Sequence, residues 1–274
     1  MDSPLPNRPV VGILHPGAMG AALGSALKPR AGTVIWAAAG RSHATSKRAE
    51  IADLVAVPDV AELARRAHVI VSICPPHAAL EVAEQVAAAL AGRADPPLYV
   101  DANAVAPATV QEIGRLLGEH RVVDGAVIGR PAYERGRTVL WLSGREAPAV
   151  ADLFDGSPFT AKVLGGDLGP ASALKACYAL QTKALPAVWG ALSDAADAYG
   201  VRDALGEQLS RDGVDLAEQV AALQARAAAK AWRWAGEMDE AAAALAAVGV
   251  PDGFSRAAAE VYRRMAGGSR GHGA

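Results

Sequence analysis

The sequence predicts an α/β domain with a mainly parallel sheet, followed by an all-α domain, and three observations support this. In the first half of the chain, apolar runs typical of buried parallel strands alternate with helical patterns. Near the N-terminus, the stretch VVGILHPGAMG (10–20) passes from an apolar run through a Pro-Gly turn into a helical pattern. From Gly169 onward no convincing strand pattern follows, and only helical patterns remain.

The elements of the first half follow from these patterns. We expect strands at Val10–Leu14, Thr33–Trp36, His68–Ile73, Leu98–Val100 and Arg121–Val127. We expect helices between them at Ala18–Leu27, Ala44–Ile51, Val60–Ala67, His77–Leu90 and Ala108–Leu117. Two further runs are expected to add edge strands around a short helix, namely Thr138–Leu142 and Ala161–Leu164 around Glu146–Phe154.

The second half is predicted to be helical throughout. Its helices are expected at Ala171–Tyr199, Asp203–Leu209, Leu216–Ala229, Trp232–Val248 and Phe254–Met265. The glycine-rich stretch Gly165–Pro170 separates the two patterns, so we predict an α/β domain over 9–167 and a helical domain over 168–266. The remaining residues, 1–8 and 267–274, are predicted to be disordered tails.

The helix expected at Ala171–Tyr199 is unusually long. Apolar residues recur along it at a spacing of three to four residues, which gives one mostly apolar stripe. Its length of about 45 Å, at ~1.5 Å per residue, exceeds what one small domain requires, and Pro186 is expected to kink it. A helix of this kind is typical of a subunit interface or of a link between two domains, and we favour a homodimer formed through the C-terminal helices.

Composition excludes several classes of function. With 27 Lys and Arg against 29 Asp and Glu, the formal net charge of −2 offers no basic excess for nucleic acid. The two cysteines, Cys74 and Cys177, show no metal-ligand spacing, and a reduced cytosolic thiol is expected for each. We find no signal-peptide pattern in Met1–Pro9 and no uncharged apolar stretch of about 20 residues, so we expect a cytoplasmic protein without a membrane span.

The turn after the first strand resembles a dinucleotide-binding turn. The fingerprint G-x-G-x-x-G requires glycine at positions 15, 17 and 20, and this chain has Gly17 and Gly20 but His15. A strand, glycine turn and helix in this order place backbone N–H groups and the positive end of a helix against a phosphate. The predicted cofactor-binding residues of the turn are His15, Pro16, Gly17, Ala18, Met19 and Gly20. The alternative is an ordinary strand-to-helix turn without a ligand.

The stretch after the second strand favours a cofactor with a 2′-phosphate. A fold that selects NAD places an acidic residue here for the ribose 2′-hydroxyl, but no acid precedes Glu50. Arg41, Ser42 and Lys47 offer cationic and hydroxyl donors instead, with Arg41 as the bidentate donor. We therefore predict NADP(H), and the alternative is a solvated basic turn.

Three further strand ends should lie at the same edge of the sheet. Cys74, Pro75 and Pro76 form a stiff turn that would line the crevice beside a cofactor ribose. Asn103 can hold a cofactor amide or a substrate oxygen, or else it organises the turn together with Asp101. The stretch Val123–Pro131 is expected to be a loop able to face the substrate, with Arg130 either meeting an acidic group or simply exposed.

Lys175 is the strongest single catalytic candidate. It lies one turn into the long helix, next to Leu174, and Tyr178 follows on the same face. A lysine partly removed from water in a cleft can exchange a proton near neutral pH. The alternative is a surface lysine whose aliphatic stem covers apolar neighbours.

Taken together, these motifs resemble the β-hydroxyacid dehydrogenase superfamily, which includes 6-phosphogluconate and 3-hydroxyisobutyrate dehydrogenases and imine reductases. The residues that carry the resemblance are HPGAMG at 15–20, the strand end with Asp101, Asn103 and Pro107, the stretch Asp124 to Gly129, and the helix opening with Gly169, Ala171 and Lys175. Lys230–Met238 and the run ALKACYA are similar to a less-studied branch with a 6-phosphogluconate-dehydrogenase-like C-terminal domain of unassigned activity.

The resemblance implies an NADP-binding Rossmann domain, a helical dimerisation domain, and Lys175 as the proton donor during hydride transfer. The chain departs from hydroxyacid members at Ala179, where they commonly have Asn, and at Ile128-Gly129-Arg130, where they have a serine-glycine-glycine loop. These departures argue against a 3-hydroxycarboxylate substrate. Imine reductases usually lack the lysine, so Lys175 favours carbonyl and alcohol chemistry.

Three functions follow as hypotheses. The first is an NADPH-dependent oxidoreductase that interconverts a small carbonyl compound and an alcohol, with Lys175 as the proton donor and Tyr178 and Asn103 positioning the substrate. The second is an imine or enamine reductase on the same scaffold, with Tyr178 as the donor. The third is a non-catalytic NADPH-binding protein, which His15 and the altered substrate loop suggest.

Overall fold

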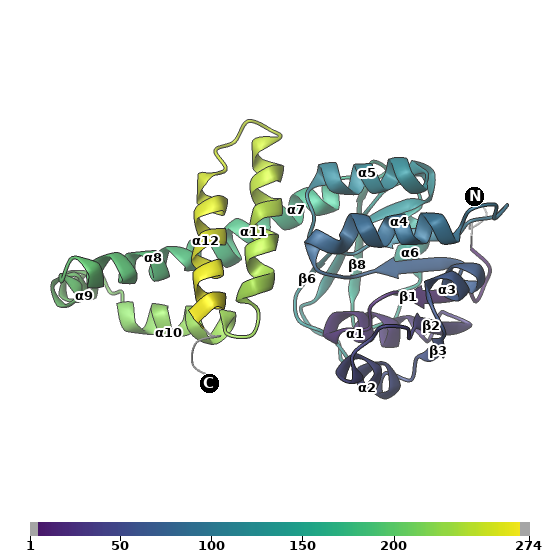
Figure 1. Ribbon diagram of the computed structural model, residues 1–274, viewed down its shortest axis with the longest axis horizontal. Coiled ribbons are helices and arrows are strands. Elements are labelled where there is room, and N and C mark those ends of the chain that lie inside the picture. The colour runs from purple at the N-terminus through teal and green to yellow at the C-terminus, as the bar shows by residue number, and fades with distance from the viewer. Residues whose placement is uncertain (1–4, 269–274) are drawn as a thin grey trace. The chain divides into compact units, whose positions relative to one another are not determined.

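The computed structural model describes residues 5–268 and divides into two compact units that meet at the Lys175–Ala176 bond. Figure 1 shows the mixed α/β unit and the helical unit. This confirms the predicted fold class. The division falls inside helix α7 (Pro170–Ala179), whereas the sequence predicts a boundary between residues 167 and 168.

The first unit is built on a sheet that has eight strands within residues 5–268, in the order β3-β2-β1-β4-β5-β6-β7-β8. The strands are β1 (Val10–Ile13), β2 (Thr33–Ala37), β3 (Val55–Val57), β4 (Val69–Ser72), β5 (Leu98–Asp101), β6 (Val122–Ile128), β7 (Val139–Ser143) and β8 (Thr160–Gly165). Neighbouring strands are parallel, except that β6 and β7 are antiparallel. The strand order reverses at β1, which lies between β2 and β4.

Helices cover both faces of this sheet, as the apolar runs on its strands predict. They are α1 (Ala18–Leu27), α2 (His43–Ile51), α3 (Val60–Arg66), α4 (Ala79–Ala89), α5 (Pro107–Leu117) and α6 (Ala147–Asp152). Residues of α1 and α6 belong to the core on one face, and residues of α3, α4 and α5 belong to the core on the other. Because both faces are covered, ligand access is left to the strand ends.

Two local features differ from the sequence prediction. The strand β3 has no counterpart among the predicted strands, because it has only three residues and Val55 and Ala56 are exposed, so it shows no buried apolar run. Disorder was expected over residues 1–8, of which 1–4 lie outside the described residues. Leu5, however, packs against the core that contains residues of α1 and α6, and Arg8 donates a hydrogen bond to the Ala31 carbonyl at 2.9 Å.

The second unit is helical, as predicted. It contains the end of α7, a π-helical turn (Leu180–Ala184), α8 (Leu185–Ala198), α9 (Arg202–Arg211), α10 (Leu216–Ala227), α11 (Ala231–Ala246) and α12 (Gly253–Gly268). Helices α11 and α12 lie side by side (Figure 1). Trp234 and Tyr262 join them with an edge-to-face contact at 5.3 Å between ring centroids, inside the core of this unit. The tail predicted over 267–274 lies outside the described residues from 269 onward.

The helix predicted as continuous over Ala171–Tyr199 is interrupted by the π-helical turn, directly before Pro186 in the first turn of α8. Proline has no N–H to donate to the Thr182 carbonyl four residues earlier. Other side chains satisfy the carbonyls of the turn: Arg226 donates to Thr182 at 3.0 Å, and the Tyr262 hydroxyl donates to Lys183 at 2.8 Å. The side chain of Lys183 forms a largely buried ion pair with Glu237 of α11 at 2.6 Å.

Within residues 5–268, we find no helix that is both long enough and apolar enough to cross a bilayer.

Candidate cofactor and active site

The candidate site lies at the carboxyl ends of β1, β2, β4 and β5. Ile13 of β1 pairs with Trp36 of β2 and with Val71 of β4, so the loops that follow these strands leave the same edge. In an open parallel sheet, ligands bind beyond this edge, at the place where the strand order reverses. That place is β1, and the loop that follows it is the predicted dinucleotide-binding turn.

The structure explains how His15 replaces the first glycine of the fingerprint. Among the described residues, the one non-glycine with a positive φ is Asp53, so the backbone at His15 has a conformation that any residue adopts. The His15 carbonyl accepts a hydrogen bond from the Gly17 N–H at 2.8 Å, which closes the turn. A Cβ at Gly20 would lie 2.1 Å from the same carbonyl oxygen. Gly20 is therefore required for close packing, whereas position 15 needs no glycine.

The start of α1 is suited to a phosphate group. Gly17 is the N-cap residue, no side chain caps the helix, and the first turn contains no acidic residue. A Cβ at Gly17 would meet nothing within 4 Å, so the space beside the turn is open. The N–H groups at a helix N-terminus attract an anion. These residues fit the pyrophosphate of a dinucleotide.

The two glycines of the turn predict losses of stability of different size for the same substitution. Gly20→Ala is expected to lower the free energy of unfolding by about 2–3 kcal/mol, because its methyl group would overlap the His15 carbonyl. Gly17→Ala should cost only about 1 kcal/mol, the usual cost of alanine at an N-cap, since its methyl group enters open space. Urea unfolding measures both. Equal losses of stability would contradict this account of the turn.

Arg41 lies close enough to the turn for its charge to act on His15. Burial is the larger influence and the positive charge of Arg41 the smaller, and together they lower the pKa of His15 to about 4. The imidazole is therefore neutral at neutral pH, and its Nδ1 atom is buried without a hydrogen-bond partner among the described residues. The Nε atom of Arg41 donates to the Ala37 carbonyl at 3.4 Å. Arg41 thus brings a cation to the end of β2.

The other two predicted residues of this loop have partners within α2. The Ser42 hydroxyl caps the helix and accepts from the Thr45 N–H at 3.3 Å. Lys47 forms an exposed ion pair with Glu50 at 3.0 Å. Arg41 is therefore the strongest of the three as a donor to a 2′-phosphate.

Asn103 holds two strand ends together. Its Oδ1 atom accepts from the Cys74 N–H at 2.6 Å, and its Nδ2 atom donates to Asp101 at 2.8 Å and to Ser72 at 3.3 Å. The side chain of Asn103 is buried and uses both polar ends within the protein. This supports the alternative in which Asp101 and Asn103 organise the turn. It also links the Cys74–Pro76 loop after β4 to the end of β5.

Burial dominates the electrostatics of this network. It raises the pKa of Asp101 to about 7, with a smaller rise from Asp124, while hydrogen bonds from Asn103 and the charge of Lys175 oppose it. Burial, and to a lesser degree Asp101, also raise the pKa of the Cys74 thiol to about 12. Cys74 is therefore protonated at neutral pH, which leaves its backbone and apolar surface to line the crevice.

Asp124 anchors the first turn of α7 to the sheet. Its buried carboxylate accepts from the Gly169 N–H at 3.1 Å, from the Ser172 N–H at 3.0 Å and from the Ser172 hydroxyl at 2.6 Å. Ser143, at the end of β7, donates to Asp124 and accepts from the Ala171 N–H, both at 3.1 Å. These bonds satisfy N–H groups that the start of a helix leaves free.

The stretch Val123–Pro131, expected to be a loop facing the substrate, is mostly strand. Strand β6 continues to Ile128 and pairs with β7, so Asp124 points into the protein as an anchor. Arg130 is exposed, as one of the two alternatives expected, and its carbonyl accepts from the Thr138 hydroxyl at 2.7 Å. Sequence reasoning missed the anchoring roles of Ser143 and Ser172. A serine at a strand end and another in the first turn of a helix were the available signals.

Lys175 reaches the same edge from the anchored end of α7. Its Nζ atom donates a hydrogen bond to the Asn103 carbonyl oxygen at 3.2 Å, and the residue is partly buried. The site thus joins Lys175 to the Asn103 network. Tyr178 follows in the last turn of α7 and is 48% exposed.

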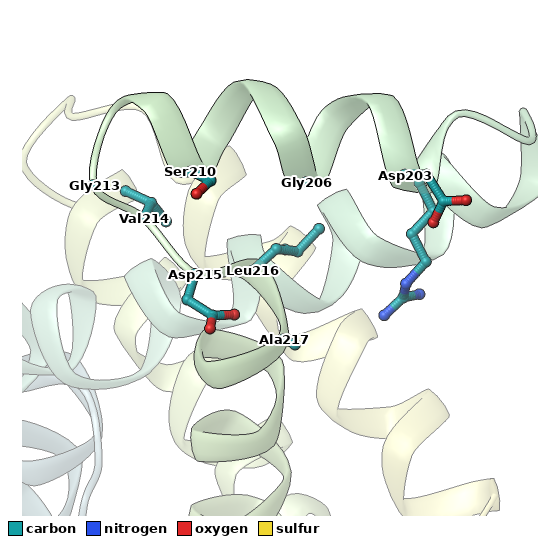
Figure 2. Close-up of a pocket in the computed structure, with 9 residues that line it drawn as sticks. Asp203, Gly206, Ser210, Gly213, Val214, Asp215, Leu216 and Ala217 are labelled. Carbon is teal, nitrogen blue, oxygen red and sulfur yellow. The ribbon is translucent and has the colours of Figure 1, made fainter.

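A separate groove of about 610 Å³ lies between α9 and the start of α10 and contains none of the predicted site residues. Figure 2 shows Asp203 of α9 and Asp215, the N-cap of α10, among the residues that line it. Asp215 already accepts a hydrogen bond from the Glu218 N–H at 3.0 Å. The groove therefore adds nothing to the candidate site.

Two family models match the chain. Residues 3–111 match the Rossmann-like domain, and residues 196–265 match the domain of unknown function DUF1932. The two matches lie one after the other, with the Rossmann-like match in the α/β unit and the DUF1932 match in the helical unit. This confirms the predicted arrangement of a Rossmann domain with a less-studied C-terminal helical domain.

Comparisons with individual proteins agree. An uncharacterised 28.5 kDa protein of Methanothermus fervidus is 32% identical over 62% of this chain, and the match spans 64% of that relative's length. A conserved protein of unknown function, described as structurally similar to 3-hydroxyacid dehydrogenases, is 25% identical, with a TM-score of 0.66 over 97% of this chain and 99% of its own.

Two solved enzymes share the fold at lower identity. The 3-hydroxyisobutyrate dehydrogenase of Mycobacterium tuberculosis is 18% identical, with a TM-score of 0.66 over 95% of this chain and 94% of its own. A reductive aminase of Aspergillus terreus in complex with NADPH is 16% identical, with a TM-score of 0.55 over 96% of this chain and 95% of its own. The chain therefore has the fold found in hydroxyacid dehydrogenases and imine reductases, as the resemblance implies.

Proposed function

We propose that this protein is an NADPH-dependent oxidoreductase that interconverts a small carbonyl compound and an alcohol. The observation that carries the proposal is the position of Lys175, whose Nζ lies 3.2 Å from the Asn103 carbonyl at the carboxyl edge of a Rossmann sheet. The fold that the chain shares with a hydroxyacid dehydrogenase and a reductive aminase supports the same reaction class.

In this proposal, different residues of the first unit bind different parts of the cofactor. His15, Pro16, Gly17, Ala18, Met19 and Gly20 hold the pyrophosphate, Arg41, with Ser42 and Lys47 nearby, binds the 2′-phosphate, and Cys74, Pro75 and Pro76 line the crevice. The reduced nicotinamide, when bound, supplies a hydride to the substrate carbon. The absence of a side-chain cap at α1 and the open space at Gly17 support this division.

Lys175 supplies the proton in the proposed reaction. As an ammonium it stabilises the negative charge that develops on the substrate oxygen, and it then transfers a proton from Nζ to that oxygen. Asn103 acts as a positioning residue, because its amide is occupied by Asp101, Ser72 and Cys74 while its carbonyl receives Lys175. Asp124 holds the helix that carries the lysine.

Reduction of an imine or enamine is the second candidate. Tyr178 favours it, because a half-exposed phenol three residues after Lys175 is an alternative proton donor on the same helix. Faster reduction of cyclic imines than of any ketone would support this reaction over the first.

A homodimer belongs to the proposal as well. Leu185 and Val188 of α8 and Tyr199 after it are exposed apolar residues, at 58%, 49% and 84%. Contiguous exposed apolar surface is typical of an interface, and we propose that these residues contribute to one.

The first experiment is a fluorescence titration of the purified protein with NADPH and, in parallel, NADH. We expect a Kd on the order of 1–10 µM for NADPH and a value at least about ten-fold higher for NADH, because the second lacks the phosphate that Arg41 would bind. Binding followed by oxidation of NADPH with a panel of ketones, aldehydes and imines would then identify the substrate class. Binding of neither cofactor would overturn the proposal, and tight binding without any oxidation would support a non-catalytic NADPH-binding protein.

A further inference from the structure

The imidazole of His15 is a buried polar group whose purpose the turn itself does not explain. The turn uses only the backbone of His15, through the hydrogen bond from Gly17 and the close approach of Gly20. The side-chain Nδ1 atom is buried and has no hydrogen-bond partner among the described residues. Buried polar atoms without a partner are rare in folded proteins, and each one calls for an explanation.

We propose that the His15 imidazole and the Arg41 guanidinium together bind the 2′-phosphate of NADP(H), and that His15 is a specificity-determining residue. This inference rests on the proposed function and assigns a role to a side chain that the function leaves unused. The histidine at the first position of the fingerprint would then favour binding of NADP(H) over NAD(H).

The positions of the two residues support this assignment. Arg41 follows β2, where a Rossmann domain reads the 2′ position of the adenosine ribose. His15 follows β1, which pairs with β2, and the charge of Arg41 reaches its ring. The two residues therefore follow neighbouring strands at the same edge of the sheet. A phosphate has acceptor oxygens for both a guanidinium and an imidazole N–H.

The environment of His15 also predicts a pH dependence. Its pKa of about 4 in the free protein reflects burial first and the charge of Arg41 second. A phosphate dianion beside the ring would favour the imidazolium and raise this pKa. The complex would then bind a proton that the free protein does not, so affinity should increase as the pH falls towards the raised pKa.

Two of the neighbouring titratable groups, Arg41 and Cys74, do not change charge in that range. Arg41, from the loop after β2, stays charged, and Cys74, from the loop after β4, has a pKa of about 12 and stays neutral. The charge of Arg41 acts on both His15 and Cys74. Asp101, at the end of β5, has a pKa of about 7 and acts on Cys74, so the protonation of His15 is followed at its own ring and not from proton uptake alone.

The test is isothermal titration calorimetry with NADP⁺ and NAD⁺ on the wild type, His15→Leu, Arg41→Leu and the double variant. We expect His15→Leu to weaken NADP⁺ binding about ten-fold and NAD⁺ binding less than two-fold. The effects of the two single variants should not add in the double variant, because both residues contact one phosphate. His120→Ala, at an exposed histidine outside the site, is the matched control and should bind like the wild type.

A second measurement reports the protonation of the His15 imidazole. Imidazole chemical shifts in NMR spectra should give His15 a pKa near 4 in the free protein and a higher value with NADP⁺ or adenosine 2′,5′-bisphosphate, but no rise with NAD⁺. Equal weakening of NADP⁺ and NAD⁺ binding by His15→Leu would assign the residue to the turn alone and overturn the inference. Unchanged NADP⁺ binding by His15→Leu would overturn it while leaving the proposed function intact. A wild type that binds neither cofactor would overturn both.

Discussion

Lys175→Met is expected to reduce turnover by about 100- to 10,000-fold while leaving the Kd for NADPH within a few-fold of the wild type. The variant loses the ammonium that would stabilise and protonate the substrate oxygen. It keeps the turn after β1 and the loop after β2, which are proposed to bind the cofactor and lie on other elements. Steady-state kinetics with the substrate found in the panel, together with an NADPH titration, measures both quantities.

The design of this experiment separates catalysis from folding. Lys230→Met, at an exposed lysine before α11, is the matched control and should retain full activity. Circular dichroism and the unfolding midpoint confirm that each variant is folded. Intact turnover in Lys175→Met would exclude the lysine as the proton donor. Intact turnover in Lys175→Met, together with a strong loss of turnover in Tyr178→Phe, would favour the imine reductase.

Asp124→Asn is expected to lower the free energy of unfolding of the first unit by about 3 kcal/mol or more. The buried carboxylate accepts four hydrogen bonds, from Ser143, Gly169 and twice from Ser172. An amide of the same shape keeps one acceptor and places N–H groups against donors that then lose their partner. Turnover should fall as well, because the first turn of α7, which carries Lys175, loses its anchor.

Urea unfolding of Asp124→Asn and of two companion variants tests this prediction. Ser172→Ala removes a single side-chain hydrogen bond at 2.6 Å to the carboxylate and should cost about 1.5–3 kcal/mol. Asp167→Asn, in the exposed stretch before α7, should change stability by less than about 0.5 kcal/mol. A loss in Asp124→Asn as small as that in Asp167→Asn would show that the carboxylate is not what anchors α7.

Local sequence patterns predicted most of the secondary structure because they arise from local physics. The helix Ala18–Leu27 has the predicted bounds, since a Pro-Gly turn precedes it and Pro29 follows its C-cap residue. The strand β3 was missed because its residues are partly exposed and few. The π-helical turn was also missed: its carbonyls depend on Arg226 and Tyr262, which come from distant helices.

The candidate site was predictable only in part. The sequence indicates the turn at His15–Gly20, the cation Arg41 and the lysine Lys175, because each follows a recognisable pattern. It does not indicate that the side-chain amide of Asn103 forms hydrogen bonds with Asp101 and Cys74, or that Asp124 caps α7. Those bonds join residues that lie between 2 and 48 positions apart in the chain.

By itself, the sequence determined the order of most strands and helices, the class of each half of the chain and the chemical types of the residues at the strand ends. Periodicity, turn residues and charge act over a few positions, so they can be interpreted without knowing which distant residues lie nearby. Only the tertiary structure decided the strand order β3-β2-β1-β4, the burial of Asp101, Asp124 and His15, and the contact between Lys175 and Asn103. Those features depend on which distant residues share the low-dielectric interior, because burial sets both the hydrogen-bond partners and the pKa of a side chain.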